Sequence, residues 1–391
     1  MKKLLNYKKI CLILAASILL LLPTYLIRFK ISVLEGGIPS TFLEIFIYFI
    51  FILFLIERLK SKGKIFSIKF ILPLVLFILA AISSYYAKER TVALGEWKAY
   101  FFDGLLVFLM FYAYAREETF QKWSLNFYLL SGLTVSIWGL LQRAKLVGLI
   151  SHQMHDPLIA AQLSQGRIFG PFESPNYLAM YIAPLIVALV ILYFRNTQFN
   201  YLKKFIWPLA IIFGLALILT QSFSSIIAVF IALAAYFAIF GKRNWWYFVF
   251  AIIIVAFGLF FINKYNAKSG SLSARNEIYH AAWRIGAAHP LIGIGPGNFP
   301  QYFLELPIKN RINYEALHPH DIFLAFWVYL GWPGLIVFLI LIGLCLRKRN
   351  LTKNPVIYFM FLTILLNGLT DTTFFKNDLA IIFWYLVAFL I

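Results

Sequence analysis

The sequence has 391 residues, of which 62% are hydrophobic and only 13% are charged. Soluble domains carry about 25% charged residues, so this composition excludes a water-soluble protein of this length. The net charge of +19 would favour a nucleic-acid partner in a soluble protein. Here we expect no nucleic-acid partner, because in a membrane protein the basic residues instead indicate which loops lie on the cytoplasmic side.

Long apolar runs without strict alternation predict an all-α integral membrane protein, because a helix needs about 20 apolar residues to cross a bilayer. We expect a single polytopic domain over residues 1–391 with about 12 transmembrane helices. No small-residue cleavage site follows the first run, so we expect a retained anchor helix. The predicted spans are 10–27, 39–57, 68–86, 97–115, 124–142, 174–194, 205–221, 223–240, 245–263, 321–346, 354–370 and 376–391.

The basic residues predict the orientation. Most of the 35 lysines and arginines fall in short loops on the side of the N-terminus, where Glu57, Glu117 and Glu118 are the only acidic residues. The positive-inside rule places this side, with both termini, in the cytoplasm. Cys11 and Cys345 both lie near predicted inner helix ends, which gives neither a disulfide framework nor a metal cluster.

Two long loops, about 143–173 and 264–320, are predicted on the outer side. Polar residues collect outside lipid without any function, and this is the alternative for each one taken alone. Function nevertheless tends to lie on long loops over a rigid scaffold, so we expect the site at the outer face. All six histidines fall in these loops: His152, His155, His280, His289, His318 and His320.

The second loop contains a predicted short amphipathic helix near residues 275–288, capped by Ser271 or Ser273. Its apolar stripe would lie on the membrane surface. Arg275 would lie in the first turn, where an arginine beside free helix-end amides favours an anion. The stripe consists of Ile278, Ala281, Ala282 and Ile285, and a second face carries Glu277, His280 and Arg284, which we expect to form a local polar network.

The same loop ends with two further motifs. Gly293 to Gly297 lacks the lysine and the preceding strand of a phosphate-binding loop, so a structural turn is favoured over a phosphate cradle. In His318-Pro319-His320-Asp321, Pro319 suits the first turn of the next helix. Helix-end amides would keep His320 neutral and able to accept a proton. The alternative is an interfacial histidine that only anchors the helix.

In the first loop, Arg167 lies among apolar residues just before a predicted span. A cation held there is costly unless it meets an anion. Glu173 is one candidate partner, and a bound phosphate is the other.

Three patches resemble the O-antigen ligase family of bacterial membrane glycosyltransferases, which includes related polysaccharide polymerases. They are Arg167 to Ala179, Arg275 to Gly297, and His320-Asp321 followed by nine residues, Gly331, two residues and Gly334. Asp321 departs from the family pattern, where Asn, Ser or Gln is usual, and it could alter the basicity of the histidine. The segment Leu219 to Ser224 resembles a further family patch but lacks its arginine.

The resemblance implies a GT-C-like enzyme of the bacterial inner membrane, inverting and without metal or cofactor, that works at the periplasmic face. Its donor would be a glycan on undecaprenyl pyrophosphate, and its acceptor a sugar hydroxyl of lipid A core or another glycan. His320 would orient or deprotonate the acceptor, and Arg167, Arg275 and, more weakly, Lys98 would hold the pyrophosphate. The expected supporting residues are His318, Asp321, Glu277 and Arg284.

Two alternatives remain from the sequence. A polymerase would use the same donor, and the histidine–glycine spacing favours the ligase. A transporter of a lipid-linked sugar would place polar groups near the bilayer midplane and in repeated halves. The predicted spans are nearly free of charge at that depth and show no repeat, which favours an enzyme at the membrane surface.

Overall fold

The computed structural model describes residues 2–31, 38–63, 67–150, 153, 162–163, 165–195, 198–241, 271–307 and 316–391. The described chain is mostly helical, in agreement with the predicted all-α class. A small antiparallel sheet was not predicted: β1 (Arg28–Ile31) pairs with β2 (Ile38–Thr41), with Arg28 opposite Thr41.

The first predicted span, 10–27, is wrong in its bounds. Helix α1 (Lys2–Ser17) ends at Ser17, and a 3-10 helix over Leu22–Leu26 leads into β1. Pro23, at the start of the 3-10 helix, lacks the backbone N–H that a continuing α-helix would need. The chain therefore leaves the helical path well before residue 27.

The other helices follow the order of the predicted spans, with three additions that were not predicted: α4 (Arg90–Trp97), α14 (Phe299–Glu305) and α16 (Lys348–Lys353). The predicted span 97–115 begins at the last residue of α4 and contains a π-helix at Lys98–Phe102 and then α5. The predicted span 245–263 lies outside the described residues. The helices are α2 (Phe42–Ser61), α3 (Ile71–Tyr86), α4 (Arg90–Trp97), α5 (Asp103–Tyr114), α6 (Glu118–Arg143), α9 (Pro175–Phe194), α10 (Lys203–Thr220), α11 (Phe223–Phe240), α13 (Ser271–Ala288), α14 (Phe299–Glu305), α15 (Ile322–Cys345), α16 (Lys348–Lys353), α17 (Pro355–Gly368) and α18 (Asn377–Leu390).

Six of the described helical segments are long and apolar enough to cross a membrane, by length and composition. They are Ile68–Tyr86, Glu118–Arg143, Pro175–Phe194, Asn200–Thr220, Phe223–Phe240 and Ile322–Cys345. The helices α17 and α18 are apolar but shorter. These helices indicate a multi-pass membrane protein, while the full number of about 12 spans stays a prediction.

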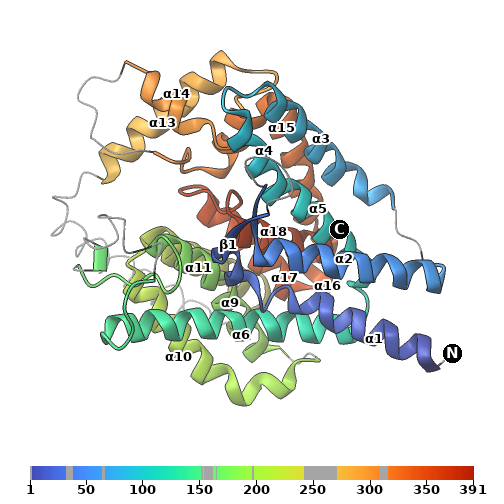
Figure 1. Cartoon of the computed structure of the whole chain (residues 1–391). Helices are drawn as coiled ribbons and strands as arrows, with labels where there is room; N and C mark the ends of the chain where they lie inside the picture. The colour runs from blue at the N-terminus through green and yellow to red at the C-terminus, as the bar shows by residue number, and fades with distance from the viewer. Residues whose placement is uncertain are drawn as a thin grey trace.

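The helices differ in how far the protein itself covers them. In the most apolar window of α9, 72% of the residues are buried inside the protein, against 28% for Asn200–Thr220, which contains α10. Figure 1 shows α9 and α18 inside the bundle and α10 at its edge. An apolar helix that the protein leaves exposed needs lipid around it, so α10 belongs to the lipid-facing surface.

Helix α15 is broken at the first glycine of the histidine–glycine spacing that the sequence analysis singled out. Gly331 has φ 68° and ψ −172°, and Pro333 follows inside the helix. A Cβ on Gly331 would lie 2.6 Å from the Leu291 backbone, so glycine lets residues 290–291 cross the helix there. The N–H of Trp332 donates to the Pro290 carbonyl at 2.7 Å. The break thereby fixes the preceding loop against α15.

Helix α13 corrects two expectations. Its apolar stripe is buried and packs against α15 rather than facing the membrane surface, and Trp283 contacts Trp327 with 4.8 Å between the ring centroids. The described helix begins at Ser271, so Arg275 lies in its second turn rather than its first. Free helix-end amides therefore do not explain the position of Arg275, and its surroundings must be sought in other segments.

Candidate functional site

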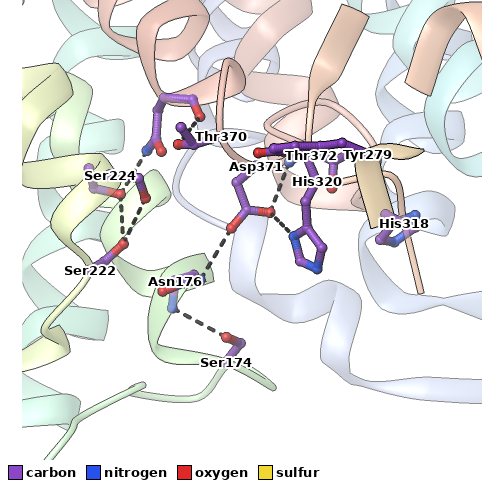
Figure 2. A network of polar contacts seen from close by, with 12 residues as sticks. Ser174, Asn176, Ser222, Ser224, Tyr279, His318, His320, Thr370, Asp371 and Thr372 are labelled. Carbon is purple, nitrogen blue, oxygen red and sulfur yellow. Dashed lines mark hydrogen bonds and ion pairs between the residues drawn. The ribbon is translucent and has the colours of Figure 1, made fainter. Parts of the chain in front are cut away.

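His320 and Asp371 form the centre of a polar cluster built from segments far apart in the sequence. His320 Nδ1 lies 3.2 Å from Asp371 Oδ1, and the two side chains are 29% and 4% exposed. His320 directly precedes α15, and Asp371 lies in the loop between α17 and α18. Figure 2 shows the imidazole directed at the carboxylate. The His320 side chain is therefore partly exposed to solvent, whereas the Asp371 carboxylate is buried behind it.

The backbone at His320 is held in an unusual conformation. Its φ is 53°, in the left-handed region, and its carbonyl accepts a hydrogen bond from Tyr279 of α13 at 3.2 Å. Asp321 is the N-cap of α15, and its Oδ1 accepts the Leu324 N–H at 2.7 Å. The helix therefore begins at Ile322, one residue after the start of the predicted span 321–346, and Pro319 is outside its first turn. Asp321 faces the helix end, whereas Asp371 is the carboxylate that contacts His320.

Asp371 is fixed as an anion by its neighbours. Burial would raise its pKa, but His320, Arg275 and the Thr372 N–H lower the pKa of Asp371 to about 2. The Thr372 N–H donates to Oδ1 at 2.9 Å, and Asn176 Nδ2 donates to Oδ2 at 3.2 Å. An ionised carboxylate only accepts hydrogen bonds, so Nδ1 of His320 carries the proton. When the ring is neutral, its Nε2 atom is left as a proton acceptor.

Arg167 enters the same cluster through Asn176. Its Nε donates to the Thr220 carbonyl at 2.9 Å, and a terminal nitrogen donates to Asn176 Oδ1 at 3.2 Å. Asn176 is in the first turn of α9, whose N-cap is Ser174. The amide of Asn176 therefore connects Arg167 to Asp371. Figure 2 shows the contact between Asn176 and Asp371.

Glu173, the expected internal partner of Arg167, is paired elsewhere. Its carboxylate lies 2.8 Å from Arg28 and 3.3 Å from Lys376, and it accepts the Tyr25 hydroxyl at 2.9 Å. No described carboxylate lies within ion-pair distance of Arg167. Burial and, to a smaller extent, the positive charge of Arg275 lower the pKa of Arg167.

Arg275 completes the cluster from α13. It acts electrostatically on Arg167, Tyr279 and Asp371, and it forms no ion pair with any described acidic residue. Two arginines of like charge beside one buried carboxylate leave an excess of positive charge. Guanidinium groups bind phosphate oxygens in a bidentate manner, so the arrangement suits an anion with several phosphate oxygens.

His318 is close to His320 but turned away from Asp371 (Figure 2). Its Nδ1 lies 3.0 Å from the Tyr329 hydroxyl on α15. Burial and the neighbouring His320 lower the pKa of His318 to about 4, so this ring stays neutral at neutral pH. His318 thus packs beside the pair without a carboxylate of its own.

Three other expected residues lie apart from this cluster. Lys98 Nζ is 2.7 Å from Glu44 Oε2 and also donates to the Pro39 carbonyl at 2.8 Å. Glu277 and Arg284 form no ion pair with each other among the described residues, and Arg284 is exposed. The local network expected on this face of α13 is therefore absent from the described structure.

The glycine-rich turn after α13 is structural. The N–H groups of Ile294 and Gly295 donate to the Val328 and Tyr329 carbonyls of α15 at 3.0 and 3.1 Å. These amides are occupied and cannot cradle a phosphate. The turn instead satisfies carbonyls beside the break at Gly331, and so supports the helix that His320 precedes.

Sequence reasoning missed two members of the cluster, Asp371 and Asn176. Asp371 is a single acidic residue in a short loop between two apolar runs, and no motif marks it. His152 and His155 lie outside the described residues. Among the described residues no group of three or more His, Cys, Asp or Glu side chains is arranged to hold a metal ion.

Residues 208–339 match the family model described as O-antigen ligase. The match supports an O-antigen ligase family assignment. No curated protein matches the chain. The matched segment includes Arg275, His320 and Gly331, whereas Arg167 and Asp371 lie outside it. Members of this family are glycosyltransferase-like enzymes, and the O-antigen ligase assignment directs attention to glycan transfer.

Proposed function

We propose that this protein transfers a glycan from undecaprenyl pyrophosphate to a sugar hydroxyl of lipid A core at the outer face of the bacterial inner membrane. The observation that carries the proposal is the pairing of His320 with Asp371 beside two arginines that have no described carboxylate partner. A proton acceptor and an anion site are the two groups that such a transfer needs. The O-antigen ligase match supports the class of reaction.

Arg167 and Arg275 hold the donor pyrophosphate in this proposal. Arg275 adds positive charge near Arg167, and a bound pyrophosphate would compensate the charge of both. As the glycosyl bond breaks, negative charge develops on the departing pyrophosphate oxygen. Arg167 is already held in place by Thr220 and Asn176, so it can stabilise that charge without rearranging.

His320 acts as the general base. Its Nε2 takes the proton from the acceptor hydroxyl while the oxygen attacks the anomeric carbon and the carbon–oxygen bond to pyrophosphate breaks. Asp371 holds the ring by its Nδ1–H and stabilises the imidazolium that forms. Attack from the face opposite the leaving group inverts the anomeric carbon. No metal enters this scheme, since Arg167 and Arg275 supply the positive charge.

The test uses purified protein, the lipid-linked glycan and lipid A core, with product resolved by gel and mass spectrometry. We expect Arg167→Gln and Arg275→Gln each to reduce transfer by about 100-fold or more, because each removes a donor to the developing charge. Arg284→Gln is the matched control, since Arg284 is an exposed arginine of the same helix as Arg275.

The outcomes separate the alternatives. If both site variants transfer glycan as Arg284→Gln does, the pyrophosphate site is wrong. If wild-type protein instead extends the glycan on its carrier lipid and leaves lipid A core bare, the protein is a polymerase with the same donor. If lipid-linked glycan crosses vesicle membranes without any transfer, the protein is a transporter.

A further inference from the structure

A second cationic site lies at the opposite end of α15 from His320. The helix has 24 residues, so its ends are separated by roughly 30 Å or more. A cavity of about 1150 Å³ opens there among residues that follow α5 and α15, the residues at the start of α3, and the end of α18. Figure 1 shows α16, which forms part of this region, on the side of the bundle where both marked chain ends lie.

The charge of the cavity is of one sign. Five basic residues line it, and no aspartate or glutamate is among its described lining residues. A smaller cavity of about 430 Å³ shares Lys353 with it and adds Arg195. The five basic residues are Lys69, Arg116, Arg347, Arg349 and Lys353.

The carboxylates nearest in sequence to these cations are already occupied. Glu117 lies 2.7 Å from Lys8, Glu118 lies 2.5 Å from Lys122, and Glu57 lies 3.3 Å from Arg58. None of the five cavity cations forms an ion pair with a described acidic residue. Basic residues that only set membrane orientation need no common cavity. Their convergence therefore requires a second explanation.

The lining of the cavity also includes apolar residues, among them Phe70, Leu72, Phe389 and Leu390. A cavity lined by both cations and apolar side chains matches an amphiphile with a phosphate headgroup and acyl chains, whereas a free phosphate would gain nothing from the apolar residues. Basic pockets between transmembrane helices bind lipid headgroups with more than one phosphate in this way.

We propose that this cavity binds the phosphate-bearing headgroup of an anionic lipid. The site is separate from the His320 cluster, and its occupant anchors the α16 end of the bundle in the bilayer. Two or more phosphate oxygens can meet several of the five cations at once. The proposal does not depend on the transfer reaction, because none of its residues contacts His320, Asp371, Arg167 or Arg275 in the described structure.

The test measures retention of added cardiolipin by the purified full chain in detergent, by native mass spectrometry. The variant Arg347→Gln/Arg349→Gln/Lys353→Gln removes three cavity cations. Lys60→Gln/Lys62→Gln/Lys348→Gln is the control, because it removes the same charge from basic residues that do not line the cavity. At about fivefold per cation, the cavity variant should lose about 100-fold in cardiolipin affinity and the control should lose little.

Three further readings decide the outcome. Phosphatidylcholine should bind the wild type and both triple variants equally weakly. The cavity variant and the control variant should have the same unfolding temperature. Equal cardiolipin retention by the two triple variants overturns the site. Displacement of cardiolipin by millimolar inorganic phosphate overturns the lipid assignment, because the occupant is then a small phosphate anion.

Discussion

Two cationic regions of this molecule look alike in sequence and differ in structure. Lys98 and Arg167 are both basic residues at the edge of apolar runs, and both were expected to hold pyrophosphate. Lys98 lies 2.7 Å from Glu44, whose side chain is 5% exposed, so its charge is already neutralised. Arg167 has only neutral acceptors and a second arginine nearby. Of the two residues, only Arg167 lacks a described carboxylate partner, so only Arg167 is a candidate for binding an anion.

The largest expected effect is on the transfer rate, and it is expected at Asp371, which Asn176 connects to Arg167. We expect Asp371→Asn to lower the transfer rate by at least about 100-fold, because a neutral amide does not stabilise the imidazolium that forms when His320 takes the acceptor proton. Asp321→Asn is the matched control. Asparagine caps a helix as well as aspartate does, so that variant should stay close to wild type. Equal activities for the two variants, measured with purified protein, would remove Asp371 from the mechanism.

A smaller effect, on stability rather than transfer, is expected at Lys98. Lys98→Gln leaves Glu44 buried without its cation, which should cost about 3 kcal/mol. The double variant Lys98→Gln/Glu44→Gln should recover most of this loss, since glutamine can also complete the capping box with Thr41. Thermal unfolding in detergent measures both. If Lys98→Gln unfolds like wild type but loses transfer, Lys98 belongs to the donor site after all.

The smallest expected effect is on the pH dependence of stability, at His318. Burial and His320 lower the pKa of His318 to about 4, against about 6.5 for an unfolded chain. The unfolded state then binds more protons between these values, so the stability that neutral His318 provides is complete above pH 6.5 and is lost as the pH falls toward 4.

Thermal unfolding across this pH range tests that sign. His318→Asn should show a shallower loss of stability with acid than wild type, by at most about 1.4 kcal/mol per pH unit. His280→Asn, at an exposed histidine of α13, should keep the wild-type slope. An unchanged slope in His318→Asn would show that His318 does not titrate in this range.

The membrane class and most helix positions follow from the sequence because long apolar runs have few alternatives in lipid. Elements that depend on partners do not follow. Strand β1 directly follows the predicted anchor span 10–27, and β2 overlaps the start of the predicted span 39–57. Helix α13 packs closely on α15 at Gly286, where a Cβ would lie 3.0 Å from the Trp327 side chain. Periodicity identifies an apolar stripe, but it does not say whether lipid or another helix covers it.

The candidate site divides in the same way. Arg167, Arg275 and His320 were singled out from local patterns, and the structure brings them into one cluster, while their roles stay predictions. Asp371 lies 51 residues from His320 in a loop without a motif, so nothing local marks it. Asp321 drew attention because it adjoins His320, yet its carboxylate caps α15. Sequence neighbours of a catalytic candidate are therefore weaker evidence than the residues that the fold brings to it.

The most direct test measures donor binding and transfer separately for two variants. His320→Gln should bind the lipid-linked donor as wild type does and lose transfer by about 100-fold or more, because only the proton acceptor is removed. Arg167→Gln/Arg275→Gln should lose donor binding. Transfer by His320→Gln at the wild-type rate would contradict the account, since the account assigns the acceptor proton to Nε2 of His320.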